Sequence, residues 1–232
     1  MFKNCLILFF AIIISGSINA QSNLLNSKSV SQIGVKSQEQ LLTDNDGPIP
    51  YGYVDDRDIL WSKVVWEFVD LNQKINLPYY FPIDTISISS DRRSLFDVLI
   101  KGIKQGKIKE TYSDSFFSSR MTQNEIESGL SSIRENNGYS DTIRTQSEDV
   151  SGYMLKGMWY FDKRQGELKY RLLALAPMSD DVETRNMEGI EDDKLYELFW
   201  VFFPSIRDVL HDAKVFNPKN AAQPISFDHL LN

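Results

Sequence analysis

Cysteine and histidine are nearly absent from this sequence. Its one cysteine is Cys5, and its two histidines are His211 and His229. Cys5 lies in a segment that we expect to be removed, which excludes disulfides, thiol catalysis and cysteine-bound metals from the mature chain. The histidines do not have the His-x-x-x-His spacing of a zinc site. These absences exclude several common kinds of catalytic and metal centre.

Motifs for nucleotide binding and nucleophilic catalysis are also missing. Neither Gly-x-Ser-x-Gly nor Gly-x-Gly-x-x-Gly occurs. Gly102–Lys107 has some likeness to a phosphate-binding loop, but it is one residue short, and Ile108 replaces the required Ser or Thr. Asp55, Asp56 and Asp58 lack the spaced ligands of a calcium loop. We therefore expect no cofactor, no metal and no catalytic residue.

Acidic residues outnumber basic ones, which gives a formal net charge of −7. Nucleic-acid binding relies on clustered Lys and Arg, so this balance argues against nucleic acid as the main partner. Carboxylates are abundant, and a pair of them for glycoside hydrolysis stays open, although the sequence singles out no pair. A periplasmic hydrolase or glycan-binding protein is therefore the alternative to a non-enzymatic role.

Residues 1–20 have the pattern of a cleaved export signal. Lys3 supplies a positive charge, Cys5–Ile14 is an uncharged apolar run, and Ala20 is the small residue at the expected cut. A membrane-spanning helix needs about 20 apolar residues, and this run is much shorter. Cys5 precedes the run, so it is badly placed to carry a lipid. We expect an exported chain with no membrane anchor of its own.

The rest of the chain divides by composition. Residues 21–47 are rich in Ser, Asn, Gln and Asp and predict a flexible leader. Residues 48–217 carry most of the large apolar residues and predict one folded domain. Residues 218–232 are expected to form a loop-like tail, in which apolar residues such as Phe227 can dock.

The first element predicted within the domain is a helix. Apolar residues from Leu60 to Ile75 recur at intervals of three and four, as on the buried face of a helix. Asp55 is a suitable cap for its first turn, and Pro78 is a suitable stop. Trp66 lies near the edge of the apolar face, so burial in the core and contact with a partner both stay open.

Two further helices are expected after a short strand at Thr85–Ile88. Ser90 is a candidate cap for a helix that ends near Gly106. The sequence Thr122–Glu125 is a capping box, which predicts a third helix reaching about Arg134. Residues 135–149 are polar and predict a loop.

The second half of the domain predicts a sheet. Tyr153–Phe161 and Glu167–Ala176 are rich in strand-forming residues and flank a turn that contains glycine, which indicates a hairpin. Leu195–Phe203 predicts a third strand, and a short helix follows from Pro204. We therefore expect a single α+β domain, with N-terminal helices packed on a small, mainly antiparallel sheet.

Three blocks of sequence resemble the GldN/PorN family of gliding motility and type IX secretion proteins. The longest is Pro50–Glu67, which reads PYGYVDDRDILWSKVVWE. The blocks Gly157–Lys163 and Trp200–Arg207 are shorter and follow in the expected order. The resemblance covers roughly residues 48–217.

The resemblance implies a periplasmic, non-enzymatic protein of Bacteroidota. Family members pair with a GldK/PorK-like outer-membrane lipoprotein and associate in a ring. The ring connects with the motor proteins GldL and GldM, whose counterparts are PorL and PorM. No catalytic residue comes with the family, and the lipoprotein would supply the membrane attachment.

Five aromatic or cationic residues of the longest block are our candidates for partner contact. They are Tyr51, Tyr53, Arg57, Trp61 and Trp66. Interface centres favour Trp, Tyr and Arg. Domain cores favour the same aromatic residues, so a folding role stays open for each of them.

Overall fold

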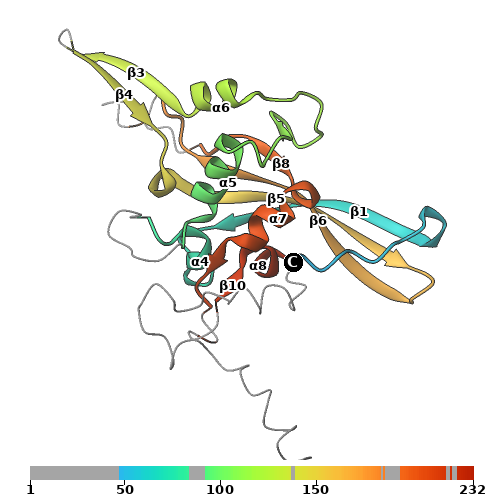
Figure 1. Ribbon diagram of the computed structural model, residues 1–232. Helices are drawn as coiled ribbons and strands as arrows, with labels where there is room; N and C mark the ends of the chain where they lie inside the picture. Colours follow the sequence, from blue (N-terminus) through green and yellow to red (C-terminus); the bar gives the residue numbers. More distant parts are fainter. Residues whose placement is uncertain are drawn as a thin grey trace, which may run out of the picture. The chain divides into compact units, whose positions relative to one another are not determined.

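The strand β1 (Ile59–Asp70) lies at one edge of a six-stranded antiparallel sheet (Figure 1). The strand order is β1-β5-β6-β8-β2, and β7 pairs with β6 beside this path. The remaining strands of the sheet are β2 (Thr111–Tyr112), β5 (Val150–Asp162), β6 (Glu167–Ser179), β7 (Tyr196–Glu197) and β8 (Trp200–Phe202).

The computed structural model describes residues 47–83, 92–136, 139–183, 185, 194–217, 220 and 224–232. All of them belong to one compact unit, Gly47–Asn232. The expected export signal, almost all of the expected leader, the strand predicted at Thr85–Ile88 and its neighbour Ser90 lie outside the described residues.

β1 corrects the prediction of an N-terminal helix. Asp55 caps only a short 3-10 turn (Asp56–Asp58), and the chain then pairs with β5 as far as Asp70. Intervals of three and four also arise when a strand carries apolar side chains on both faces, as β1 does. Its β-branched and aromatic residues favour a strand. Pro78 lies within the short helix α4 (Leu77–Tyr80), which follows the 3-10 turn Lys74–Asn76.

Three helices pack on one face of the sheet. They are α5 (Leu95–Lys104), α7 (Phe203–Asp212) and α8 (Phe227–Leu231). One buried cluster joins them to β5 and β6, with Leu95, Leu99, Phe203, Ile206, Leu210 and Phe227 from the helices and Tyr153, Leu172 and Leu175 from the strands. This cluster is the main core.

The opposite face of the sheet carries a smaller cluster. Ala174 and Ala176 alternate with Leu175, so their side chains point away from the helices. They meet Trp200 from β8, and Phe117 packs against them from the loop after β2. The loop Ser113–Arg120 therefore covers part of the face that the helices leave open.

The helix α5 is confirmed, with a different cap. The hydroxyl of Ser94 accepts a hydrogen bond from the backbone N–H of Asp97 at 3.2 Å. Gly106 follows the last turn with φ +68, a conformation that suits glycine and ends the helix as predicted.

The capping box at Thr122 and Glu125 is also confirmed, but its helix is shorter than predicted. α6 spans Gln123–Gly129, and the chain then forms a hairpin of β3 (Ser131–Asn136) and β4 (Tyr139–Arg144). This hairpin replaces much of the predicted loop and projects away from the main sheet (Figure 1). A 3-10 turn at Ser147–Asp149 leads into β5.

The hairpin of β5 and β6 is confirmed, and both strands are longer than predicted. The strand predicted at Leu195–Phe203 is interrupted, since β7 and β8 take parts of it and α7 begins at Phe203. In the tail, β10 (Ile225–Ser226) pairs with β9 (Lys214–Val215), and Phe227 is buried.

The fold is α+β, as predicted from the sequence. Its proportions differ from the prediction, because a strand takes the place of the first helix and the sheet has six strands. The fold leaves the long strand β1 at an open edge, with large side chains on both of its faces.

Candidate interaction surface

Apolar side chains are exposed along β1. Leu60 is 69% exposed, Trp61 50%, Trp66 47% and Phe68 46%. Within the described part of the chain, β1 pairs with β5 alone, so its other edge has no neighbouring strand. Exposed large apolar side chains beside an unpaired strand edge mark a candidate interaction site. We take β1 and the side chains around it as the candidate surface.

Trp61 and Trp66 lie on opposite faces of β1. They are separated by an odd number of positions, and side chains alternate along a strand. Both are exposed, so neither is a core residue in the sense that the periodicity suggested.

The ring of Trp66 belongs to a cage around the ammonium group of Lys156. This Nζ lies 4.7 Å from the ring centre of Phe116, 5.3 Å from Phe117 and 5.6 Å from Trp66. It donates a hydrogen bond to the carbonyl oxygen of Ser115 at 2.5 Å. Cation–π attraction and this bond compensate for the burial of the charge. Because a lysine of the same chain fills the cage, its rings are not open to a ligand cation.

Asp114 shapes the loop that completes the cage. Its carboxylate accepts backbone N–H bonds from Phe116 at 2.7 Å, Ser118 at 3.1 Å and Ser119 at 3.2 Å. Desolvation raises the pKa of Asp114, but the three N–H donors outweigh it and hold the pKa below its usual range. Phe117 takes φ +61 at the turn, and Phe116 is left 70% exposed beside Trp66. The loop therefore extends the apolar surface of β1.

Tyr51 joins the beginning of the described unit to its end. Its ring centre lies 4.6 Å from the guanidinium of Arg171 and 4.4 Å from that of Arg207. Its hydroxyl donates to Oδ1 of Asn232 at 3.0 Å. Arg207 in turn makes two buried hydrogen bonds to Asp228, at 2.7 and 3.0 Å. Tyr51 thus has a clear role in folding.

Tyr53 and Arg57 have the character of surface residues. Tyr53 is 81% exposed. Arg57 pairs with Asp55 at 2.9 Å, which is a local contact two positions away along the chain. Exposed ion pairs add little stability, so the fold does not need this one.

The five candidate residues therefore do not form one site. Tyr51 packs on the C-terminal part, Trp66 packs on the loop after β2, and Trp61, Tyr53 and Arg57 face solvent. Sequence reasoning missed Lys156, Arg171 and Asp228. A lysine within a strand predicts a solvated side chain, and no local signal announces partners this far apart in sequence.

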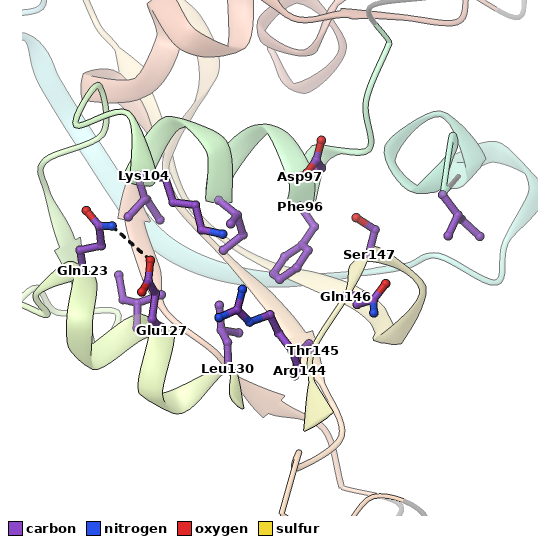
Figure 2. A pocket seen from close by; sticks show the side chains of 14 residues that line it. Phe96, Asp97, Lys104, Gln123, Glu127, Leu130, Arg144, Thr145, Gln146 and Ser147 are labelled. Carbon is purple, nitrogen blue, oxygen red and sulfur yellow. Dashed lines mark hydrogen bonds between the residues drawn. The ribbon is translucent and has the colours of Figure 1, made fainter. Parts of the chain in front are cut away.

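A separate cavity of about 210 Å³ lies between α5, α6 and residues 144–147 (Figure 2). Phe96, Ile126 and Leu130 form part of its apolar lining. Charged residues also line it, namely Asp97, Lys104, Glu127 and Arg144. The buried hydroxyl of Thr145 has no hydrogen-bond partner among the described residues, and Gln123 donates to Glu127 at 3.1 Å. The sequence does not predict this cavity, because the polar residues 135–149 that contribute to it predict a loop.

The described ranges hold neither a candidate metal site nor a candidate membrane-spanning helix. No group of three or more His, Cys, Asp or Glu is placed there to hold a metal ion. No helix in those ranges is long and apolar enough to cross a membrane.

Comparison with known proteins identifies the family. The sequence model described as Gliding motility associated protein GldN matches residues 54–232. The match runs from the segment before β1 through α8, so it includes the C-terminal residues that pack on Tyr51. No curated protein matches the chain. Since the match covers most of the sequence, the chain belongs to the GldN family of gliding-motility-associated proteins.

Proposed function

We propose that this GldN-family protein is a non-enzymatic, periplasmic subunit of the type IX secretion and gliding motility machine. In this role it forms a ring complex with a GldK/PorK-like outer-membrane lipoprotein. The ring connects with motor proteins of the GldL/GldM (PorL/PorM) kind. Residues 1–20 act as the cleaved export signal, and the lipoprotein provides attachment to the outer membrane.

The observation that carries the proposal is the exposed apolar surface of β1 in a member of this family. Trp61 and Phe68 would be costly to leave in water and are suited to burial against another protein. The described residues offer a surface for contact, whereas their carboxylates do not gather into a metal site.

Deletion of the gene tests the proposal at the level of the cell. The deletion strain is expected to lose secretion of type IX cargo and gliding, and the wild-type gene is expected to restore both. Normal secretion in a deletion strain without a paralogue would reject the proposal.

Co-purification with the lipoprotein tests the contact itself. Tyr53→Ala and Arg57→Ala are expected to lower recovery of the lipoprotein while leaving the melting temperature unchanged, because both side chains are exposed. Tyr51→Ala is the matched control, since loss of its packing should lower the melting temperature. If Tyr53→Ala and Arg57→Ala retain full recovery, the lipoprotein does not bind at these positions.

A hydrolase or glycan-binding role is the alternative that the cavity favours. Asp97 and Glu127 both line it, and glycoside hydrolysis uses two acids. Turnover of an envelope glycan by the pure protein, abolished in Asp97→Asn or Glu127→Gln, would establish this role instead. If both variants secrete normally, the acids of the cavity are not needed for secretion.

A further inference from the structure

We propose that the open edge of β1 pairs with the same edge of a second copy, so that two sheets join into one across a two-fold axis. This inference deepens the proposed assembly role and rests on it. It names a second copy as the occupant of the β1 surface and gives the register of the contact.

The backbone of β1 has hydrogen-bonding groups that point away from β5. Leu71 donates its N–H to the carbonyl of Ser151 at 3.1 Å, directly across the two strands. Backbone groups alternate in direction along an antiparallel strand, so Val65 and Val69 also point toward β5. The backbone groups of Val64, Trp66 and Phe68 therefore point toward the open edge.

Among the described strands of the main sheet, β1 has the longest open edge, whereas β6 is open only from Glu167 to Leu172, before it meets β8 and β7. β2, at the far edge, has only two residues. A head-to-tail contact of β1 with either of these shorter edges would therefore give fewer hydrogen bonds than a contact of β1 with β1. Pairing of β1 with β1 of another copy uses the long edge on both sides, and it is necessarily antiparallel about a two-fold axis.

The charges on β1 select one register. Lys63 and Glu67 are both exposed, and they share a face because they are four residues apart. When the two-fold axis passes at Val65, Lys63 of each copy lies opposite Glu67 of the other. A register centred on Lys63 or on Glu67 would bring like charges together, which is unfavourable in a sheet.

The same register also agrees with the direction of the backbone hydrogen-bonding groups along β1. Val64 of one copy lies opposite Trp66 of the other, and these are residues whose backbone groups point outward. Val65 meets Val65, and Lys63 meets Glu67, at the closer, non-hydrogen-bonded positions, where side chains interact best. Each dimer would contain two such charge pairs and would bury apolar side chains on both faces of the strand.

A two-fold contact closes on itself, so it supplies pairs and not a ring. Growth of a ring from such pairs needs a second contact, such as the one proposed with the lipoprotein. The inference therefore assigns β1 to contact between copies and leaves the other surfaces for the lipoprotein.

Charge exchange tests the register in the purified full chain. Sedimentation over a range of concentrations is expected to show a monomer–dimer equilibrium. Lys63→Glu or Glu67→Lys alone should weaken dimerisation about tenfold, because like charges then face each other twice. The double variant with both reversals should restore it. Lys101→Glu on α5 is the control, with the same change of charge away from the edge.

A cysteine at the two-fold axis gives an independent test. With Cys5 replaced by Ser, Val65→Cys is expected to form a disulfide-linked dimer under mild oxidation. Residues at such close antiparallel positions have Cα atoms about 4.5 Å apart, within the range of a disulfide. Lys63→Cys should not cross-link, because it lies opposite position 67 of the other copy.

The outcomes separate this inference from the proposed function. A purely monomeric chain, or a dimer that the double charge reversal does not restore, would overturn the β1 pairing even if the deletion strain loses secretion. A dimer with the expected charge pattern from a strain that secretes normally would keep the pairing and reject the secretion role. Monomeric protein whose Lys63→Glu variant loses the lipoprotein would assign the edge to that partner and overturn the inference.

Discussion

The guanidinium of Arg207 lies 4.4 Å from the ring centre of Tyr51. This contact holds the segment before β1 against α7, and the buried bonds from Arg207 to Asp228 extend it to α8. The C-terminal residues are therefore part of the folded unit.

Asp228→Ala should strongly destabilise the fold. It leaves Arg207 buried without its carboxylate partner, a change that costs about 3 kcal/mol or more. Urea unfolding followed by circular dichroism measures the loss. Arg57→Ala, which breaks only the exposed pair with Asp55, is the control and should leave the midpoint unchanged. Similar midpoints for both variants would show that the buried pair has no special role.

Lys156→Ala should loosen the loop after β2. The variant removes the donor to Ser115 and the cation between the three rings, and it leaves a cavity behind. We expect a loss of about 2 kcal/mol in unfolding free energy. Amide hydrogen exchange of residues 113–120 should rise with it. Lys163→Ala, in the exposed turn of the β5–β6 hairpin, is the control; unchanged exchange in Lys156→Ala would contradict the cage.

Replacing Gly157 or Gly129 by alanine should change the free energy of unfolding in opposite directions. A Cβ at Gly157 would overlap with the ring of Tyr170, so Gly157→Ala should cost about 1–3 kcal/mol. Gly129 lies in α6 with open space around it, so Gly129→Ala should stabilise by roughly 0.5–1 kcal/mol. Thermal unfolding of both variants measures the difference. Adding Tyr170→Ala to Gly157→Ala should relieve part of the loss; strict additivity would argue against the overlap.

The contribution of Asp114 to stability should depend on pH. Its folded-state pKa is lowered, so the charged carboxylate stabilises the fold fully above the ordinary value of 3.8. That contribution is lost as the pH falls through the lowered folded-state pKa. Asp114→Ala should therefore lower the urea midpoint at pH 7, and its difference from wild type should shrink below pH 3.8. A difference that is the same at both ends of this range would assign it to packing.

Local signals predicted some elements correctly. The β5–β6 hairpin combines two strand-forming runs with a short turn, and the capping box at Thr122 and Glu125 marks the start of α6. Both depend on residues close together in the chain, so one sequence is enough to find them.

Tertiary context decided the elements that the sequence mispredicted. The apolar residues of β1 serve both faces of an edge strand, and their intervals imitate a helix. The break between β7 and β8 also has no sequence signal, because it lies within the strongly apolar run Leu195–Phe203.

For the candidate residues, the sequence likewise predicts some features and misses others. The sequence marked the segment from Tyr51 to Trp66 but did not separate its roles, because aromatic residues serve cores and surfaces alike. The partners that define those roles, such as Arg207 for Tyr51 and Lys156 for Trp66, lie far away along the chain.

The hydrogen bond from Tyr51 to Asn232 has a practical consequence for engineering. It places the two ends of the folded unit side by side, so a short linker can join them. New termini opened in the exposed turn between β5 and β6 would then give a circular permutant with every strand pairing retained. Such a permutant would leave no free chain end beside Tyr51 and would carry fluorescent labels in the turn between β5 and β6.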